Sequence, residues 1–158
     1  METIAKKEKA NEIRVYASHS QDPKKNPLSF DYKMAILDLF IPGDHVKIMN
    51  KSKANNPFAM IEELAKEGFE NIIIVAGSDR IAEYQKAEKY ALADGAKTFK
   101  VVSAGERDPD AEGAEGMSAS KLRKAAAEGD YDSFKLGVGK PGIAKDLYNE
   151  VRKGMGIK

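Results

Sequence analysis

Residues 116–123, Gly-Met-Ser-Ala-Ser-Lys-Leu-Arg, carry the residue types that bind phosphate groups at the start of a helix. Gly116 allows a tight turn, and Ser118 or Ser120 can cap a helix and leave further backbone amides pointing at an anion. Lys121 and Arg123 add positive charge, and an arginine can hold two phosphate oxygens at once. The same spacing also suits an ordinary capped surface helix with two solvated cations, so both interpretations stay open.

A second polar turn follows the most apolar segment of the chain, residues 71–76. Gly77, Ser78, Asp79 and Arg80 would bring backbone amides and a carboxylate to the end of that segment. Asp79 can hold a ribose hydroxyl, or it can cap the helix that follows. Of these two roles for Asp79, the residue types alone favour the helix cap.

A third polar loop, residues 18–27, is dense in hydrogen-bond donors and acceptors. His19 in this loop can donate a proton or hydrogen-bond a substrate, although a loop of this polarity can also be solvated and inert. His45 begins a later strand and is interpreted as structural. With two histidines, no cysteine and no spaced carboxylate cluster, we expect no protein-only metal site.

Helical and extended patterns alternate along the chain, which predicts an α/β fold with a doubly wound parallel sheet. In such sheets ligands bind at the carboxyl ends of the strands, and that rule selects the loops at residues 18–26, 77–80 and 103–120. The pattern predicts helices at residues 1–10, 30–40, 55–67, 79–92, 118–128, 130–136 and 143–152, and strands at residues 12–17, 45–49, 71–76 and 98–103.

Composition limits the possible partners. The 158 residues suit a single domain, residues 1–158, and 26 basic side chains nearly balance 25 acidic ones. Such a balance provides no general attraction for nucleic acid or an anionic membrane, so phosphate binding must be local. The absence of cysteine suits a reducing cytosol, and we expect neither a secretion signal nor a membrane span.

Longer strings of residues resemble a known family. Residues 118–123, Ser-Ala-Ser-Lys-Leu-Arg, are similar to the ISSTKIR-type signature of the cytidylyltransferase-like superfamily of nucleotidyltransferases. Residues 18–28, 75–80 and 103–113 resemble, more closely, the nucleotidyltransferases that are widespread in bacterial viruses. The resemblance covers nearly the whole chain. It implies a Rossmann-like sheet of the adenine nucleotide alpha hydrolase-like type, and a cytoplasmic location, in a host cell if the protein is viral.

The resemblance implies transfer of AMP or CMP from a nucleoside triphosphate, ATP or CTP, to a small phosphorylated acceptor, with release of pyrophosphate. Mg²⁺ would arrive with the triphosphate. By position, Met117, Ser118, Ser120, Lys121 and Arg123 would bind the triphosphate, and Lys121, Arg123 and His19 are the catalytic candidates. The nucleotide-pocket candidates are Gly77, Ser78, Asp79 and Arg80. The acceptor-binding candidates are Ser20, Gln21, Lys24 and Lys25.

One signature of the family is missing. Its members have a Gly-rich H-x-G-H loop after a first, central strand, whereas this sequence contains no H-x-G-H. The resemblance therefore implies a chain that begins where that loop would end and that lacks the first strand. We expect either unpaired strand edges or direct pairing of the strands at residues 12–17 and 71–76. A second polypeptide that supplies the strand, or self-association, would protect such edges. A catalytically incomplete nucleotide-binding or assembly module is the alternative function.

Overall fold

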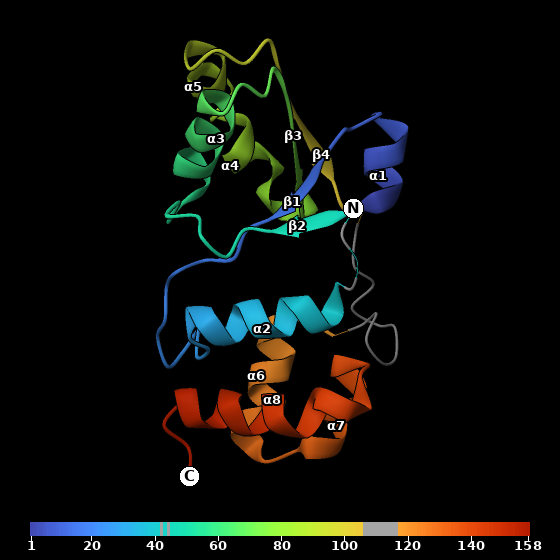
Figure 1. Ribbon diagram of the computed structural model, residues 1–158. Coiled ribbons are helices and arrows are strands. Elements are labelled where there is room, and N and C mark those ends of the chain that lie inside the picture. The colour runs from blue at the N-terminus through green and yellow to red at the C-terminus, as the bar shows by residue number, and fades with distance from the viewer. Residues whose placement is uncertain (42, 44, 106–116) are drawn as a thin grey trace. The chain divides into compact units, whose positions relative to one another are not determined.

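Helices and short strands alternate through the first two thirds of the chain, and helices follow them (Figure 1). The computed structural model describes residues 1–41, 43, 45–105 and 117–158, so Gly116 lies outside the described residues. The elements are α1 (Glu2–Lys7), β1 (Ile13–Val15), α2 (Phe30–Phe40), β2 (Val46–Ile48), α3 (Pro57–Lys66), β3 (Asn71–Ala76), the 3₁₀ turn η1 (Ser78–Arg80), α4 (Ile81–Gln85), α5 (Glu88–Ala93), β4 (Thr98–Ser103), α6 (Ala119–Glu128), α7 (Tyr131–Val138) and α8 (Pro141–Gly154).

Side-chain caps set where several helices begin, as the sequence predicts. The Asn56 side chain accepts a hydrogen bond from the Ala59 amide at 2.9 Å, and Pro57 occupies the first turn of α3. Asp130 caps α7 in the same way, through the Ser133 amide at 3.0 Å. Gly129 ends α6 with a φ of 79°, a left-handed conformation that glycine adopts without strain.

The helix predicted at residues 79–92 is divided into η1, α4 and α5. No glycine or proline lies within residues 81–93 to signal a break. Ala87, at the junction of α4 and α5, is 1% exposed and packs into the core with Ala91. The helix is therefore interrupted where Ala87 packs into the core, although the local helix propensities predict no interruption.

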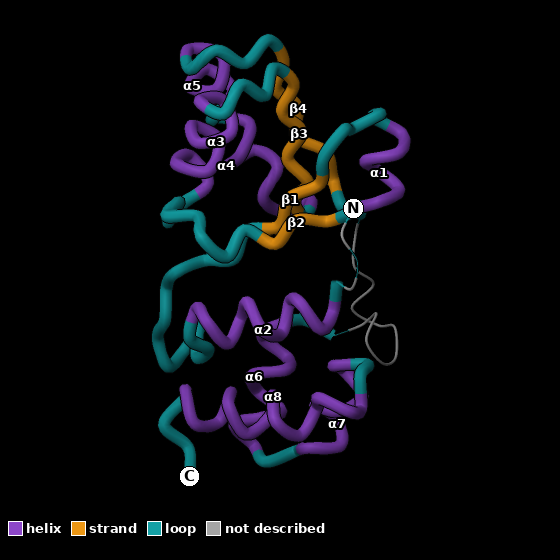
Figure 2. The backbone as a smooth tube through the Cα atoms, in the orientation of Figure 1, coloured by secondary structure: helices purple, strands orange, loops and turns teal. Residues whose placement is uncertain are grey.

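The strands form two parallel pairs, β1 with β2 and β3 with β4 (Figure 2). The mixed α/β class and parallel pairing predicted from the sequence are confirmed. Ile13 lies opposite Val46 in the first pair, and Ile73 lies opposite Lys100 in the second. In the part of the chain that the structure describes, β1 and β3 do not pair with each other. Of the two expected outcomes for these strands, the structure has the unpaired edges.

The chain divides into two compact units, and the first comprises Met1–Ser18 and Asp38–Glu106. It contains all four strands that the structure describes, with α3, α4 and α5 on one side of β3 and β4 and α1 on the other (Figure 1). Its core gathers Ile61 and Ala91, both fully buried, with Ile72, Ile74 and Phe99. The apolar run at residues 71–76 forms a strand as the sequence predicts. Only alternate residues, Ile72, Ile74 and Ala76, are buried, so the strand is not buried on both faces as its continuous apolar run suggests.

The second unit comprises His19–Leu37 and Arg107–Lys158. Its described part is helical, and its core is built around Phe134, which is 1% exposed, and Tyr148, whose rings meet edge to face at 5.3 Å. Tyr32 and Ile36 of α2 pack against this core. No helix among the described residues is long and apolar enough to cross a membrane.

Candidate functional site

The start of α6 has the capped geometry that the sequence predicts. Ser118 has extended backbone angles, and its Oγ accepts a hydrogen bond from the Lys121 amide at 3.0 Å. The amides of Ala119 and Ser120 in the first turn have no acceptor within their own helix, as at any helix start. The positive end of the helix dipole and these amides make the turn suited to an anion.

Arg123 is held beside that turn by a second serine. Its Nη2 donates a hydrogen bond to the Ser120 Oγ at 3.2 Å. This contact keeps the guanidinium on the side of the helix where Ser120 lies, one turn from the Ser118 cap. Ser118, Ser120 and Arg123 are therefore brought together as the sequence predicts, with Lys121 on the same turn.

Met117 anchors the start of α6 to α7. A Cβ atom placed on Gly137 would lie 2.5 Å from Met117 Cγ, so the methionine side chain occupies the space above this glycine. Deeper in the helix, Ala125 and Ala126 are buried in the core of the second unit. The candidate phosphate-binding turn is therefore the end of a firmly packed helix.

The candidate acceptor loop is folded around a carboxylate. Asp22 Oδ1 accepts hydrogen bonds from the amides of Lys24, at 2.9 Å, and Lys25, at 2.7 Å. The Lys25 amide, the Asn26 side chain and the remaining amides of the turn lower the pKa of Asp22. These bonds order the turn, although residues 18–21 and 23–25 are exposed, so a solvated, inert loop stays the alternative. Lys24 and Lys25 are exposed on its surface.

The other predicted residues of this loop make contacts within the second unit. The His19 ring stacks on Phe30 with centroids 4.0 Å apart. Gln21 Nε2 donates to the Pro27 carbonyl oxygen at 3.4 Å. The Ser20 carbonyl oxygen accepts a hydrogen bond from Lys33 Nζ at 2.8 Å.

Lys33 is a functional candidate that the sequence analysis did not single out. It lies one turn into α2, and burial lowers the pKa of its ammonium group. The sequence does indicate this residue, because Lys33 closely follows the loop that contains Lys24 and Lys25.

Residues 77–80 form a tight polar turn after β3. The Arg80 amide bonds the Gly77 carbonyl oxygen at 2.9 Å. A Cβ on Gly77 would lie 2.8 Å from Asp79 Oδ1, so the carboxylate folds over the glycine. Neither η1 nor α4 has a side-chain cap, so the interpretation of Asp79 as a helix cap is wrong. Ser78 and Arg80 are exposed, and Arg80 lies 3.7 Å from Glu83.

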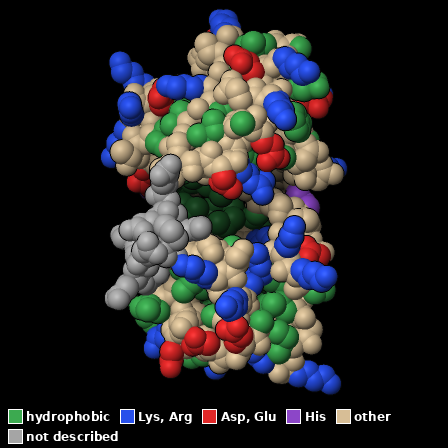
Figure 3. Space-filling view, turned by 180° about the vertical axis from the view of Figure 1, so that it is seen from behind, with side chains coloured by type: hydrophobic (Ala, Val, Ile, Leu, Met, Phe, Trp, Pro, Cys, Tyr) green, Lys and Arg blue, Asp and Glu red, His purple; other side chains and the backbone are tan. Residues whose placement is uncertain are grey.

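The predicted site residues thus belong to both units. Gly77, Ser78, Asp79 and Arg80 lie in the first unit, whereas His19–Lys25 and Met117–Arg123 belong to the second. Among the residues that the structure describes, no three histidine, aspartate or glutamate side chains gather as metal ligands. On the face shown in Figure 3, Lys and Arg side chains are interspersed with Asp and Glu.

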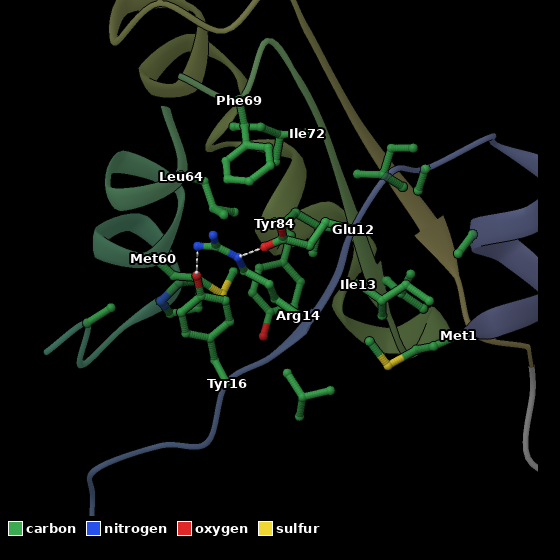
Figure 4. A pocket seen from close by; sticks show the side chains of 18 of the residues that line it. Met1, Glu12, Ile13, Arg14, Tyr16, Met60, Leu64, Phe69, Ile72 and Tyr84 are labelled. Carbon is green, nitrogen blue, oxygen red and sulfur yellow. Dashed lines mark hydrogen bonds and ion pairs between the residues drawn. The ribbon is translucent and has the colours of Figure 1, made fainter. Parts of the chain in front are cut away.

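An apolar cavity of about 450 Å³ lies in the first unit, and the sequence analysis did not locate it. β1, β3, α1, α3 and α4 all contribute to its lining, with Ile13, Leu64 and Tyr84 among the contacting side chains (Figure 4). The sequence analysis expected unpaired strand edges, which is the one indication of this cavity. The distance between β1 and β3, however, depends on the tertiary structure.

Arg14 crosses one side of this cavity and binds two carboxylates. Its guanidinium forms ion pairs with Glu12 and, at 2.7 Å, with Glu67, and it lies 4.8 Å from the centre of the Phe69 ring. The Glu67 hydrogen bond raises the pKa of Arg14, and burial raises the pKa of Tyr16 beside it. Lys47 also pairs with Glu12, at 2.7 Å, so two cations balance the two carboxylates on this side of the cavity.

No protein-family model, curated protein or solved structure matches the chain. The function must therefore be argued from the residues and their geometry.

Proposed function

We propose that the chain is a nucleotidyltransferase that transfers AMP or CMP from a nucleoside triphosphate to a small phosphorylated acceptor. The observation that carries this proposal is the start of α6, where Ser118 caps the helix and Ser120 holds the Arg123 guanidinium at 3.2 Å. The resemblance of residues 118–123 to the nucleotidyltransferase signature supports it. The proposal includes a doubly wound, Rossmann-like arrangement of the parallel strand pairs.

The proposed reaction is an in-line displacement at the α-phosphorus. An oxygen of the acceptor phosphate bonds to this phosphorus, while the bond to pyrophosphate breaks and its electron pair leaves with pyrophosphate. The α6 amides, Lys121 and Arg123 would stabilise the charge on the leaving group. Mg²⁺ bound to the triphosphate would neutralise further charge.

The acceptor would bind at the loop that Asp22 organises. Lys24 and Lys25 are exposed there and would bind the acceptor phosphate. Lys33 Nζ donates to the Ser20 carbonyl oxygen at 2.8 Å and so holds this loop against α2. His19 would hydrogen-bond the acceptor from the same loop.

A nucleotide-binding module without turnover is the second candidate. This candidate is favoured because both histidines of the sequence already contact other side chains of the protein. His19 stacks on Phe30, and His45 Nε2 lies 2.7 Å from the Glu2 carboxylate. No H-x-G-H is present to stabilise the transferring phosphate.

Nucleotide binding is the first test, with fluorescent ATP and CTP analogues and Mg²⁺ titrated by anisotropy. Arg123→Ala should weaken binding about tenfold, the effect of losing one charge-assisted hydrogen bond. Lys124→Ala is the matched control, because Lys124 is 74% exposed and lies 3.8 Å from Glu128. Equal affinities for the two variants would contradict the proposed phosphate site.

Turnover separates the two candidates. The chain is incubated with Mg²⁺, each triphosphate and a panel of phosphorylated acceptors, and pyrophosphate is measured. Release that depends on Arg123 supports the transferase. Binding with no release for any pair supports the module, and no binding at all contradicts both.

A further inference from the structure

The apolar cavity of the first unit has the size of a small-molecule site. Its volume of about 450 Å³ is roughly three times that of an engineered apolar cavity that binds benzene. Natural ligand pockets measure about 300–1,000 Å³ and are lined mainly by apolar side chains with a few polar groups. The volume therefore suits a molecule of two or three fused rings.

Apolar side chains border the cavity on both faces of β1. Neighbouring residues of a strand point to opposite faces, so Ile13 lies on the side of α1 and Arg14 on the side of α3 (Figure 4). Ile4 of α1 lines the cavity with Ile13, and Leu64 and Phe69 line it with Arg14. A ligand would therefore bury apolar surface against both faces.

The charged side chains of the lining are already paired. Arg14 forms ion pairs with Glu12 and Glu67, and Glu8 Oε1 lies 2.7 Å from Lys100 Nζ. A charged ligand would lose its water here without gaining a partner of opposite charge, which is unfavourable. The complementary ligand is therefore uncharged.

Tyr84 supplies a hydrogen-bond donor to this lining. Among the described residues no hydrogen-bond partner is recorded for its hydroxyl group. Tyr16, the other phenol of the lining, accepts a hydrogen bond from Arg14 Nη1 at 3.5 Å. Figure 4 shows both rings on the same side of β1 as Arg14. Because a phenol can donate its proton, Tyr84 suits a ligand that carries a carbonyl oxygen.

α1 is a weakly attached wall of the cavity. None of its residues is buried. Two ion pairs tie it to the rest of the unit, Glu2 with His45 and its C-cap Glu8 with Lys100, and each has a partner that is more than half exposed. Surface pairs of this kind contribute little to stability. A ligand could therefore displace α1 on entry and hold it in place once bound.

We propose that this cavity binds an uncharged, mainly apolar small molecule of two or three rings that carries a carbonyl group, and that α1 closes over it. The carbonyl oxygen accepts a hydrogen bond from Tyr84, and the rings contact Ile4, Ile13 and Leu64. Burial of apolar surface drives binding, and the hydrogen bond orients the ligand. The lining residues all belong to the first unit, so the inference does not depend on the phosphate site of α6 in the second.

The test uses prodan, an uncharged naphthalene ketone whose emission moves to the blue in apolar surroundings. The dye is titrated into the 158-residue chain and its fluorescence is measured. We expect saturable binding of one dye molecule per chain. An anilinonaphthalene sulfonate, which has similar rings and a negative charge, should bind at least about tenfold more weakly.

Two pairs of variants locate the bound dye. Tyr84→Phe keeps the ring and removes the hydroxyl group, so prodan should bind about threefold to tenfold more weakly. Tyr90→Phe is its matched control, because Tyr90 is 51% exposed and does not line the cavity. Ile4→Lys adds charge to the lining and should weaken binding at least about tenfold. Thr3→Lys adds the same charge at an exposed position of α1 and should not.

Closure by α1 is measured by hydrogen exchange with and without prodan. The amides of Ala5 and Glu8 donate hydrogen bonds of 2.9 Å to carbonyl oxygens one turn earlier. Their exchange should slow at least about tenfold when the dye binds. The Ser133 amide, which is bonded at the start of α7, should not change.

Three outcomes would overturn the proposal. The first is the absence of saturable prodan binding. The second is equal affinity of the parent chain, Ile4→Lys and Tyr84→Phe, which would mean that the dye binds elsewhere. The third is an affinity that falls as the concentration of the chain rises, which would identify a second copy as the occupant of the cavity.

Discussion

Arg14 Nη1 and Nη2 donate to the two carboxylate oxygens of Glu67 at 3.0 and 2.7 Å, across 53 positions of sequence. This paired hydrogen bond joins β1 to the residue that ends α3. A planar guanidinium matches a carboxylate in this geometry, whereas an ammonium group does not.

Replacement of Arg14 by lysine should therefore destabilise the first unit by about 2 kcal/mol, because the paired hydrogen bond and the contact with the Phe69 ring are both lost. Chemical denaturation measures the loss. Lys97→Arg is the control, since Lys97 and Glu70 form a pair in which both side chains are more than half exposed, and its effect should stay below about 0.5 kcal/mol. Similar effects for the two variants would contradict a structural role for Arg14.

Acid should weaken the first unit through the same contacts. Lys47 lowers the pKa of Glu12 below its ordinary value of 4.5, and Arg14 does so for Glu67. Above pH 4.5 both groups are charged in the folded and unfolded states, and their stabilisation is complete. As the pH falls through the lowered pKa values, the unfolded state binds more protons and this stabilisation is lost.

The measurement is the free energy of unfolding between pH 6 and pH 2. A Glu12→Gln and Glu67→Gln double variant should be less stable at pH 6 and should lose less stability on acidification. Parallel curves for the two proteins would show that other carboxylates cause the acid sensitivity.

Gly154 provides a test of how α8 packs in the second unit. A Cβ at this position would lie 1.9 Å from the Pro27 carbonyl oxygen. Gly154→Ala should therefore cost about 1–3 kcal/mol and displace the loop that precedes Pro27. In the same helix, Gly142→Ala meets no atom within 4 Å and should raise stability by up to about 1 kcal/mol. Thermal unfolding compares the two, and unchanged stability in Gly154→Ala would contradict the close approach to Pro27.

Two substitutions at Ser118 distinguish its effect on helix stability from its effect on nucleotide binding. Asp is as good an N-cap as Ser and interacts favourably with the helix dipole, so Ser118→Asp should keep the stability of α6. Its negative charge would repel a triphosphate, and nucleotide affinity should fall at least about tenfold. Ser118→Ala should instead cost about 1 kcal/mol of stability. Unchanged affinity in Ser118→Asp would mean that phosphate binds elsewhere.

The sequence by itself determined most of the elements. Asn56 with Pro57, and Ser118 and Asp130, are local signals that begin helices where the structure has them. The β-branched run at residues 71–76 specified a buried strand, because few local conformations suit so many Ile and Val side chains. The pairing of Ser120 with Arg123 was predictable because residues three apart are neighbours on a helix surface, and Ser118 because it is a favoured N-cap.

Only the tertiary structure decided the remaining features. The break at Ala87 comes with burial in the core of the first unit, and the Arg14–Glu67 contact joins residues whose spacing in sequence carries no periodic signal. Strand pairing is also non-local, so the β1 and β3 edges and the cavity between them follow from how the helices pack against each pair. Local propensity acts over a few neighbouring residues, whereas these contacts depend on segments that meet only after the chain has folded.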